Sequence, residues 1–287
     1  MTYSRLIAGT MTWGSWGKQL SKKEMASMID FCVANNITTF DHADIYGAYT
    51  TEADFGKAFA DSGLKRKEIQ LISKCGIQDE CENRPNKVKH YNYSKDYIIW
   101  SVEESLRNLN TDYLDLLLLH RPSPLMVAEE IAEAITILKK DGKIRDFGVS
   151  NFTPSQMDMI GLRMDIDVNQ IEFSLTEHTA MYNGTLDFMM TSGIKPMAWS
   201  PLGSVFKEDT EQTRRIHKQL GALKDKYNAT EDQLLLAWIM KHPSGVHPVV
   251  GTTTKERLQQ AVAATKINLE TEDWFLILTA AQGHKVP

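Results

Sequence analysis

The sequence lacks the features that define several large classes of protein. Its 287 residues contain no uninterrupted apolar run of about 18 residues, and the first residues hold no apolar export segment. Three cysteines are too few for a disulfide framework and favour a reducing compartment. A net charge of −5 provides no positive field for a phosphate backbone. We therefore expect a cytoplasmic protein that binds neither membranes nor nucleic acid.

The composition that remains is that of a globular protein with a substantial core. Hydrophobic residues make up 42% of the chain and charged residues 24%. A single α/β barrel typically needs about 250 residues, so this chain is long enough for one. No low-complexity tract, proline-rich linker or block of like charges divides it. We predict one domain over residues 1–287.

Short apolar runs alternate with longer segments of helical period, and eight such runs can be counted. They are Leu6–Ala8, Thr38–Phe40, Ile69–Ser73, Leu114–Leu119, Ile144–Val149, Val168–Phe173, Pro196–Trp199 and Pro248–Val250. Eight strand-helix units with right-handed crossovers most simply close into a (β/α)8 TIM barrel, an α/β fold. A doubly wound open sheet is the alternative from pattern alone.

Helix signals lie between the predicted strands. Apolar residues recur at the spacing of one helix face at Met25, Met28, Ile29, Cys32 and Val33. Three pairs have the spacing of a capping box, in which two side chains satisfy backbone N–H groups at a helix start. These pairs are Ser21 with Glu24, Thr153 with Gln156, and Thr230 with Gln233.

Polar residues directly follow several of the apolar runs. They are Asp41, Lys74, His120, Ser150 and Asn151, and Tyr46 lies five residues after Asp41. In a barrel of this type the carboxyl ends of the strands form the active site, so these side chains should meet at one mouth. Since a half-buried charge needs a partner, we expect Asp41 and Lys74 to pair. Each residue alone has an ordinary structural explanation, but together they favour a catalytic site.

Five segments, in order, resemble the aldo-keto reductase family: Phe40–Gly47, Ile72–Lys74, Leu116–Pro122, Gly148–Phe152 and Trp199–Gly203. The resemblance runs from the first strand to about Ala261. It implies a (β/α)8 barrel that binds NADP(H) and reduces a small-molecule carbonyl substrate. The segment Gly76–Lys95 is longer than in the small-molecule reductases of the family and is similar to an uncharacterised bacterial oxidoreductase subgroup.

The resemblance also implies catalytic roles. Tyr46 is expected to be the general acid, Lys74 to tune it, Asp41 to anchor Lys74, and His120 to orient the carbonyl oxygen. A tyrosine with an ordinary pKa of about 10 is a poor proton donor at neutral pH. A neighbouring ammonium stabilises the phenolate and lowers that pKa, so the pairing of Tyr46 with Lys74 fits the chemistry.

Cofactor contacts are implied at three places along the chain. The nicotinamide amide is expected at Ser150, Asn151 and Gln170, and the nicotinamide ring on Trp199. The pyrophosphate is expected against Ser200, Leu202 and Gly203. The adenosine phosphate is expected at Gly251, Thr252, Thr253 and Arg257, with Gln260 near the adenine. Two residues in this last region differ from the pattern of the family. Gly251 takes the place of a lysine found in some relatives, and Ala261 takes the place of an asparagine that is often found there.

Other functions were weighed against this one. No Gly-x-Gly-x-x-Gly follows a strand, so a Rossmann cofactor site is not predicted. Asp41, His42, Asp44 and His120 contain the ligand types of a metal-dependent hydrolase, but that hypothesis leaves Tyr46 and Lys74 unexplained. A cofactor-binding regulatory protein on the same fold, with little turnover, is the main alternative. Four aromatic residues are candidates for a substrate pocket: Trp13, Trp16, Tyr49 and Tyr91.

Overall fold

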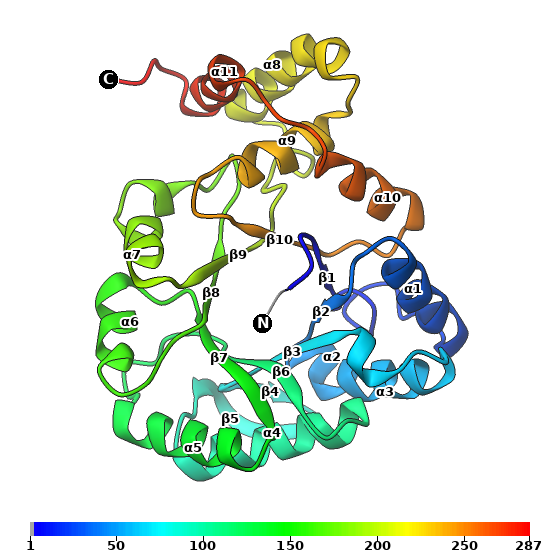
Figure 1. Ribbon diagram of the computed structural model, residues 1–287, viewed down its shortest axis with the longest axis vertical. Coiled ribbons are helices and arrows are strands. Elements are labelled where there is room, and N and C mark those ends of the chain that lie inside the picture. The colour runs from blue at the N-terminus through cyan, green and yellow to red at the C-terminus, as the bar shows by residue number, and fades with distance from the viewer. Residues whose placement is uncertain (1–2) are drawn as a thin grey trace.

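Eight parallel strands close into a barrel in the computed structural model, which describes residues 3–287 (Figure 1). Around the barrel the strands follow the order β1-β10-β9-β8-β7-β6-β3-β2, and every neighbouring pair is parallel. The predicted (β/α)8 barrel is therefore confirmed, and the open-sheet alternative is wrong.

Each predicted apolar run overlaps one barrel strand. The strands are β1 (Ile7–Gly9), β2 (Thr39–Asp41), β3 (Gln70–Cys75), β6 (Leu114–Leu119), β7 (Ile144–Ser150), β8 (Val168–Glu172), β9 (Lys195–Trp199) and β10 (His247–Val250). The bounds of the strands differ from the predicted bounds by at most two residues, which is usual for the ends of such elements.

Helices surround the barrel on its outer face (Figure 1). They are α1 (Lys22–Ala34), α2 (Tyr46–Tyr49), α3 (Thr51–Asp61), α4 (Lys95–Leu109), α5 (Ala128–Lys140), α6 (Pro154–Gly161), α7 (Thr185–Ser192), α8 (Glu211–Tyr227), α9 (Glu231–Met240), α10 (Lys255–Ala264) and α11 (Thr271–Gln282). Two short 3₁₀ turns are η1 (Arg66–Glu68) and η2 (Thr179–Met181). No helix within residues 3–287 has the length and hydropathy to cross a membrane.

The apolar residues of the strands divide into two layers because successive side chains point to opposite faces. In β6, Leu116 and Leu118 belong to a small cluster that also contains Ile7 and Ile72. Leu117 belongs to the large cluster between strands and helices. All six residues of β6 are buried, which explains its continuous apolar sequence.

The sequence signals for helix starts are also confirmed. Helix α1 begins after Ser21, whose side chain forms a capping box with Glu24. Its buried residues Met25, Met28, Ile29 and Cys32 are four of the five in the predicted stripe. Helix α6 begins after Thr153 with the same device, and α9 after Thr230. These ends satisfy backbone N–H groups that a helix leaves without intrahelical partners.

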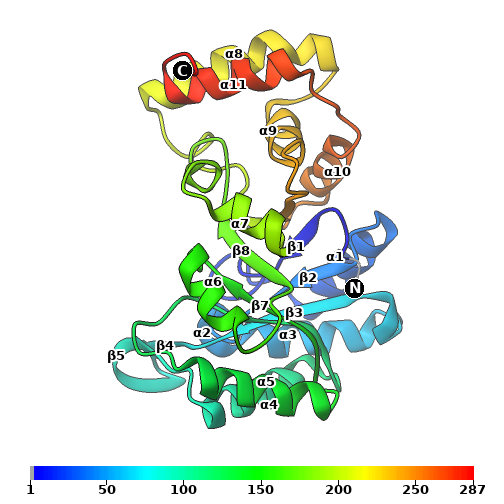
Figure 2. The ribbon, with the colours of Figure 1, turned by 60° about the vertical axis from the view of Figure 1, so that its left-hand side comes forward.

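One element was not predicted. The segment between Gly76 and Lys95 forms an antiparallel hairpin of β4 (Ile77–Cys81) and β5 (Arg84–Tyr91), which pairs only with itself. Most residues of β5 are exposed, so the strand has no apolar alternation by which the sequence could have indicated it. Figure 2 shows the hairpin projecting from the barrel beside α2.

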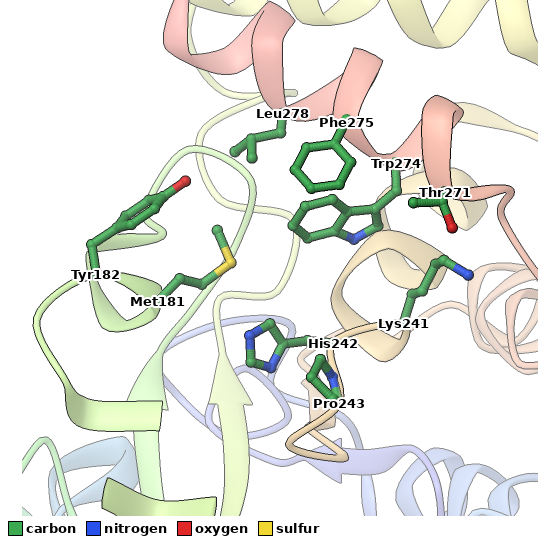
Figure 3. Close-up of a pocket in the computed structure, with 9 residues that line it drawn as sticks. All are labelled: Met181, Tyr182, Lys241, His242, Pro243, Thr271, Trp274, Phe275 and Leu278. Atoms are coloured by element: carbon green, nitrogen blue, oxygen red, sulfur yellow. The ribbon is translucent and has the colours of Figure 1, made fainter. Parts of the chain in front are cut away.

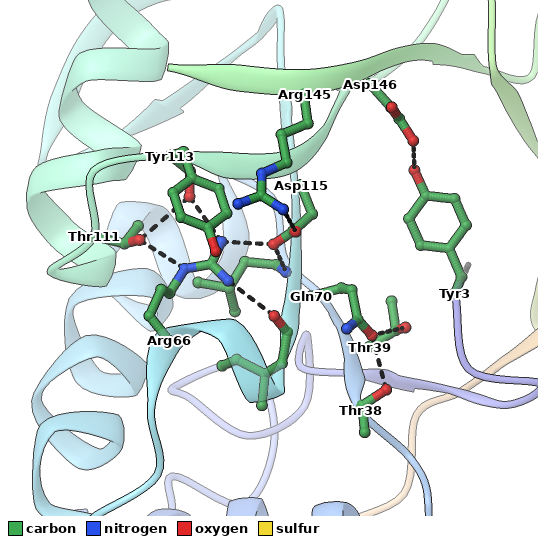
Figure 4. A network of polar contacts seen from close by, with 12 residues as sticks. Tyr3, Thr38, Thr39, Arg66, Gln70, Thr111, Tyr113, Asp115, Arg145 and Asp146 are labelled. Atoms are coloured by element: carbon green, nitrogen blue, oxygen red, sulfur yellow. Dashed lines mark hydrogen bonds and ion pairs between the residues drawn. The ribbon is translucent and has the colours of Figure 1, made fainter. Parts of the chain in front are cut away.

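The amino-terminal end of the barrel is closed by a polar network (Figure 4). Arg66 pairs with Asp115 at 2.6 Å and also donates hydrogen bonds to the carbonyl oxygens of Ile69 and Tyr113. The Asp115 carboxylate accepts from the backbone N–H of Leu71. This network joins η1, β3 and β6 at the face of the barrel where stabilising residues are typical.

Helices α8 and α11 pack against each other outside the ring of barrel helices (Figure 2). Trp274 of α11 stacks on Trp238 of α9 at 4.9 Å, and each indole N–H donates to the other residue's carbonyl oxygen. Beside this contact an apolar cavity of about 360 Å³ opens between α11, the end of η2 and residues 241–243, which follow α9 (Figure 3). It is lined by residues of these outer elements and by none of the predicted catalytic residues.

Candidate active site

Lys74 lies at the centre of the predicted catalytic group. Its ammonium Nζ donates to Asp41 Oδ2 at 2.8 Å, to the His42 carbonyl oxygen at 2.9 Å and to the Tyr46 hydroxyl at 3.1 Å. The predicted ion pair between Asp41 and Lys74 is confirmed, and both side chains are almost fully buried. Burial opposes the charged form of Lys74, but Asp41 and Tyr46 outweigh it and raise the pKa of the ammonium. Lys74 is therefore a permanent cation against the phenol.

Asp41 ends β2 and is held from two sides. One carboxylate oxygen binds Lys74, and the other accepts from Gln170 Nε2 at 2.9 Å. Gln170 lies in β8, across the barrel, so three strands contribute to this chain of contacts. The sequence places Gln170 among the expected cofactor residues, and in this structure its side-chain nitrogen donates to the Asp41 carboxylate.

Tyr46 begins α2 on the loop that leaves β2. Burial raises the pKa of the Tyr46 phenol, while the Lys74 ammonium lowers it, and the net direction is upward. The effect of Lys74 has the expected sign, but burial is the larger contribution. The phenol thus remains protonated in this structure and contacts the cation that would stabilise its anion.

His120 follows β6 and faces the same phenol. The His120 and Tyr46 rings lie edge to face with centroids 6.0 Å apart. Burial and the nearby charges of Lys74 and Arg121 lower the pKa of His120 well below its ordinary value. The imidazole is therefore neutral at physiological pH. Its Nδ1 atom is buried without a hydrogen-bond partner among the described residues.

Three of the predicted nicotinamide residues form a connected group beside these. Asn151 Nδ2 donates to Ser150 Oγ at 2.8 Å, and Trp199 Nε1 donates to Asn151 Oδ1 at 3.0 Å. Asn151 has a φ of 61°, a left-handed backbone conformation that asparagine tolerates better than most residues. The structure brings together Ser150, Asn151 and Trp199 at the ends of β7 and β9.

The predicted pyrophosphate segment turns sharply after β9. Ser200 has a φ of 49° and Gly203 a φ of 56°. A Cβ at Gly203 would lie 2.0 Å from Thr176 Oγ1, so no other residue fits there. Leu202 is half-buried between them. The backbone of this turn is fixed by packing against Thr176, whose hydroxyl also accepts from the Ser204 N–H.

The predicted adenosine-phosphate residues lie at the start of α10. A Cβ added at Gly251 would meet no atom within 4 Å, so the protein's own packing does not require glycine there. Thr252 and Thr253 are half-exposed and Arg257 is exposed. Together they present hydroxyl, guanidinium and backbone N–H donors, the groups that bind phosphate. Gln260 is exposed beside them, and its side-chain oxygen accepts from Gln233 Nε2 at 2.7 Å.

Three aromatic or charged side chains around the site lie in positions that the sequence did not determine. Trp13 is fully buried between Phe40 and Phe55, so it cannot line a substrate pocket. Trp16 is 45% exposed with its ring 6.2 Å from that of Tyr46. Arg121, to which no role was given, stacks on the Trp199 ring at 5.2 Å. The sequence feature that could have identified Arg121 is its position directly after His120.

Two of the residues considered for a metal site form hydrogen bonds with hydroxyl groups. His42 Nδ1 hydrogen-bonds the Thr10 hydroxyl, and Asp44 accepts from Ser101. Burial lowers the pKa of His42 to about 3. Within residues 3–287, no group of three or more histidine, cysteine or acidic side chains has the arrangement of a metal site.

The fold and this group of residues together describe a closed (β/α)8 barrel whose strand ends bring a lysine, a tyrosine and a histidine close together. Residues 5–280 match the aldo/keto reductase family, and the chain belongs to that family. It is 45% identical to the uncharacterized oxidoreductase YcsN of Bacillus subtilis, over 100% of this chain and 97% of the relative. It is 36% identical to a 6-dehydroglucose reductase of Agrobacterium fabrum, over 99% and 96%.

A solved structure agrees with the fold. The aldo/keto reductase from Klebsiella pneumoniae, solved in complex with NADP and acetate, superposes with a TM-score of 0.80 at 26% identity. The match covers 98% of this chain and 92% of that one. The resemblance implied that the chain is similar to an uncharacterised oxidoreductase subgroup of the family. Its similarity to YcsN confirms this prediction.

Proposed function

We propose that this protein reduces aldehydes or ketones to alcohols with NADPH, and that Tyr46 is the proton donor. The observation that carries the proposal is the position of Lys74 Nζ, 2.8 Å from Asp41 Oδ2 and 3.1 Å from the Tyr46 hydroxyl. A cation fixed by a buried carboxylate and placed on a phenol is suited to stabilise the phenolate that forms when the proton leaves.

Bound NADPH supplies the hydride that reaches the carbonyl carbon. Tyr46 would give its proton to the carbonyl oxygen. A C–H and an O–H bond then form in the substrate, while its C=O π bond, the Tyr46 O–H bond and the C–H bond of the hydride donor break. The negative charge left on Tyr46 faces Lys74, and a proton from water restores the phenol. His120, as a neutral imidazole, donates an N–H to the carbonyl oxygen without adding a charge.

Cofactor binding is assigned to residues at three strand ends. Ser150 and Asn151 would hold the nicotinamide amide, and Trp199 the ring. The turn at Ser200, Leu202 and Gly203 would cover the pyrophosphate. Gly251, Thr252, Thr253 and Arg257 would bind the adenosine phosphate, where the open space next to Gly251 leaves room for an approaching ligand.

Arg257 suits a 2′-phosphate, so a fluorescence titration should give tighter binding of NADPH than of NADH. Equal binding would contradict the role of Arg257.

The test is the substitution Tyr46→Phe, which removes the hydroxyl and keeps the ring. We expect kcat/KM for carbonyl reduction to fall by about 10²- to 10⁴-fold, because the proton donor is lost, while NADPH affinity stays within about twofold. Tyr182→Phe, on the exposed side of η2, is the matched control. Turnover is followed by the loss of reduced-nicotinamide absorbance.

The substrate panel should contain 6-dehydroglucose, the substrate named for the Agrobacterium relative, together with neutral and carboxylate-bearing aldehydes, because Arg121 lies on Trp199. Undiminished reduction by Tyr46→Phe would contradict the assignment of the proton donor. Tight NADPH binding by the wild type without turnover of any carbonyl would instead support a regulatory protein on this fold.

A further inference from the structure

The turn that follows Tyr46 has an unusual backbone. Gly47, Ala48 and Tyr49 have consecutive φ values of 61°, 53° and 69°. Glycine adopts this left-handed conformation freely, but at Ala48 and Tyr49 it is strained. Such strain persists only where the surroundings impose it. Because Tyr46 directly precedes this turn, the groups that hold the turn also affect where the Tyr46 hydroxyl lies.

The β4–β5 hairpin makes direct contacts with the strained residues. Asn83, at the hairpin tip, donates from Nδ2 to the Ala48 carbonyl oxygen at 2.7 Å. The Tyr49 hydroxyl donates to the Ile77 carbonyl oxygen at 3.2 Å and accepts from the Asp79 N–H at 3.0 Å. Both non-glycine residues of the turn are thus bonded to the hairpin.

Arg84 joins the hairpin to this turn and to α4. Its guanidinium lies between two aromatic rings, 4.0 Å from the centroid of Tyr49 and 4.6 Å from that of Trp100. It also donates to the Tyr97 hydroxyl at 3.1 Å. A planar cation stacked on two rings with a hydrogen bond at its edge is fixed in orientation. It therefore fixes the rings that it contacts.

A buried carboxyl links the same arginine to the catalytic strand. Asp44, two residues before Tyr46, accepts from Ser101 at 3.1 Å and Tyr97 at 3.3 Å, and its backbone N–H donates to the Lys74 carbonyl oxygen at 3.0 Å. Burial raises the pKa of the Asp44 carboxyl, and the positive charge of Arg84 lowers it. Arg84 thus interacts with Asp44, which precedes Tyr46, and with Tyr49, which follows it.

We propose that the β4–β5 hairpin is a positioning element for catalysis, and that Arg84, Asn83 and Tyr49 hold the left-handed turn that places the Tyr46 hydroxyl against Lys74. These residues act through Tyr46 and do not touch the reacting atoms. The inference rests on the proposed function, because its effect on turnover presupposes that Tyr46 is the proton donor.

The test compares two arginines that make the same kind of contact at opposite ends of the barrel. Arg84 stacks on Tyr49, and Arg145 stacks on Tyr113 at 3.9 Å. In Arg84→Met we expect kcat to fall by about tenfold to hundredfold, since displacements of about 1 Å have effects of this size. The Kd for NADPH should change less than about twofold. Arg145→Met should leave both quantities unchanged.

Amide hydrogen exchange provides a readout that does not need activity. The Tyr49 N–H donates to the Ile45 carbonyl oxygen and the Thr50 N–H to that of Tyr46. Both amides should exchange faster in Arg84→Met and at the wild-type rate in Arg145→Met. Tyr49→Phe, which removes only the hydroxyl, should reproduce the faster exchange and the lower kcat in a milder form.

The outcomes separate the two proposals. A wild type that reduces no carbonyl would remove the proposed function, while the exchange rates would still decide whether the hairpin holds the turn. Unchanged exchange in both Arg84→Met and Tyr49→Phe would overturn the inference, whatever happens to kcat. Faster exchange with an unchanged kcat would also overturn it, because the turn would then be held without positioning Tyr46.

Discussion

One ion pair lies at each end of this barrel, partly buried at the amino-terminal end and almost fully buried at the carboxyl end, and the two pairs are built differently. At the amino-terminal end, Arg66 and Asp115 hydrogen-bond mainly with each other and with nearby backbone groups (Figure 4). At the carboxyl end, Lys74 also bonds the His42 carbonyl oxygen, and the pair makes further hydrogen bonds with the side chains of Tyr46 and Gln170. The first pair ties strands together; the second holds a titratable group. Burial of a charge pair therefore does not by itself indicate function, but its additional partners do.

The largest expected effect comes from Lys74→Met. Turnover should fall by about 10²- to 10⁴-fold, since the cation that stabilises the Tyr46 anion is removed. The uncompensated Asp41 should also lower the free energy of unfolding, by about 3–5 kcal/mol. Steady-state kinetics and chemical denaturation measure both. Lys143→Met, which removes an ammonium bonded to Glu103 on the surface, is the control. A Lys74→Met enzyme within tenfold of wild-type kcat would erase the contrast between the pairs.

Arg66→Met tests the opposite end. The free energy of unfolding should fall by about 3 kcal/mol, because Asp115 stays buried with Arg145 as its remaining cation, 3.8 Å away. Turnover per folded molecule should remain within about twofold of wild type. Urea denaturation gives the first quantity, and kinetics well below the midpoint of thermal unfolding gives the second. A large loss of kcat in the folded variant would show that this network reaches the active site.

A smaller, pH-dependent effect is expected from Asp44. Burial and the neighbouring Glu52 raise the pKa of Asp44 to about 7, against the lowering influences of Arg84 and Ser101. The folded protein therefore keeps this proton at pH values where the unfolded chain has lost it. The contribution is complete below the ordinary carboxyl pKa and is lost as the pH rises towards 7.

The variant Asp44→Asn should remove that dependence. Between about pH 5 and pH 8 its free energy of unfolding should decline less than that of the wild type, by at least about 1 kcal/mol. Denaturation midpoints measured across this interval provide the comparison. Parallel profiles for the two proteins would mean that Asp44 titrates at its ordinary pKa. The contrast between the two ends of the barrel would then be limited to the ion pairs.

The barrel was predictable because its parallel strands are buried on both faces. Such strands appear in the sequence as apolar runs, and Leu114–Leu119 was located without error. The hairpin escaped prediction for the opposite reason, since β5 is mostly exposed and contains Arg84, Pro85 and Asn86 in place of an apolar alternation. Its stability comes from contacts with α2 and α4, which no local pattern encodes.

In the candidate site, too, some residues were indicated by the sequence and some contacts were not. Asp41, Lys74 and His120 were identifiable because a charged or titratable residue directly after an apolar run must lie at a strand end. The bond from Gln170 to Asp41 depends on where two side chains meet across the barrel, and spacing along the chain does not determine this. The net direction of the pKa shift at Tyr46 depends on burial, which requires the packed structure.

The hairpin has a consequence for how this scaffold can change over generations. Because β4 and β5 pair only with each other, residues can be inserted or deleted there without altering the register of any barrel strand. Barrel strands lack this freedom, since each pairs with two neighbours. Apart from the residues that hold the turn after Tyr46, the hairpin can therefore change while the barrel is preserved. A lineage could adjust its reaction rate through this appendage and leave its catalytic residues untouched.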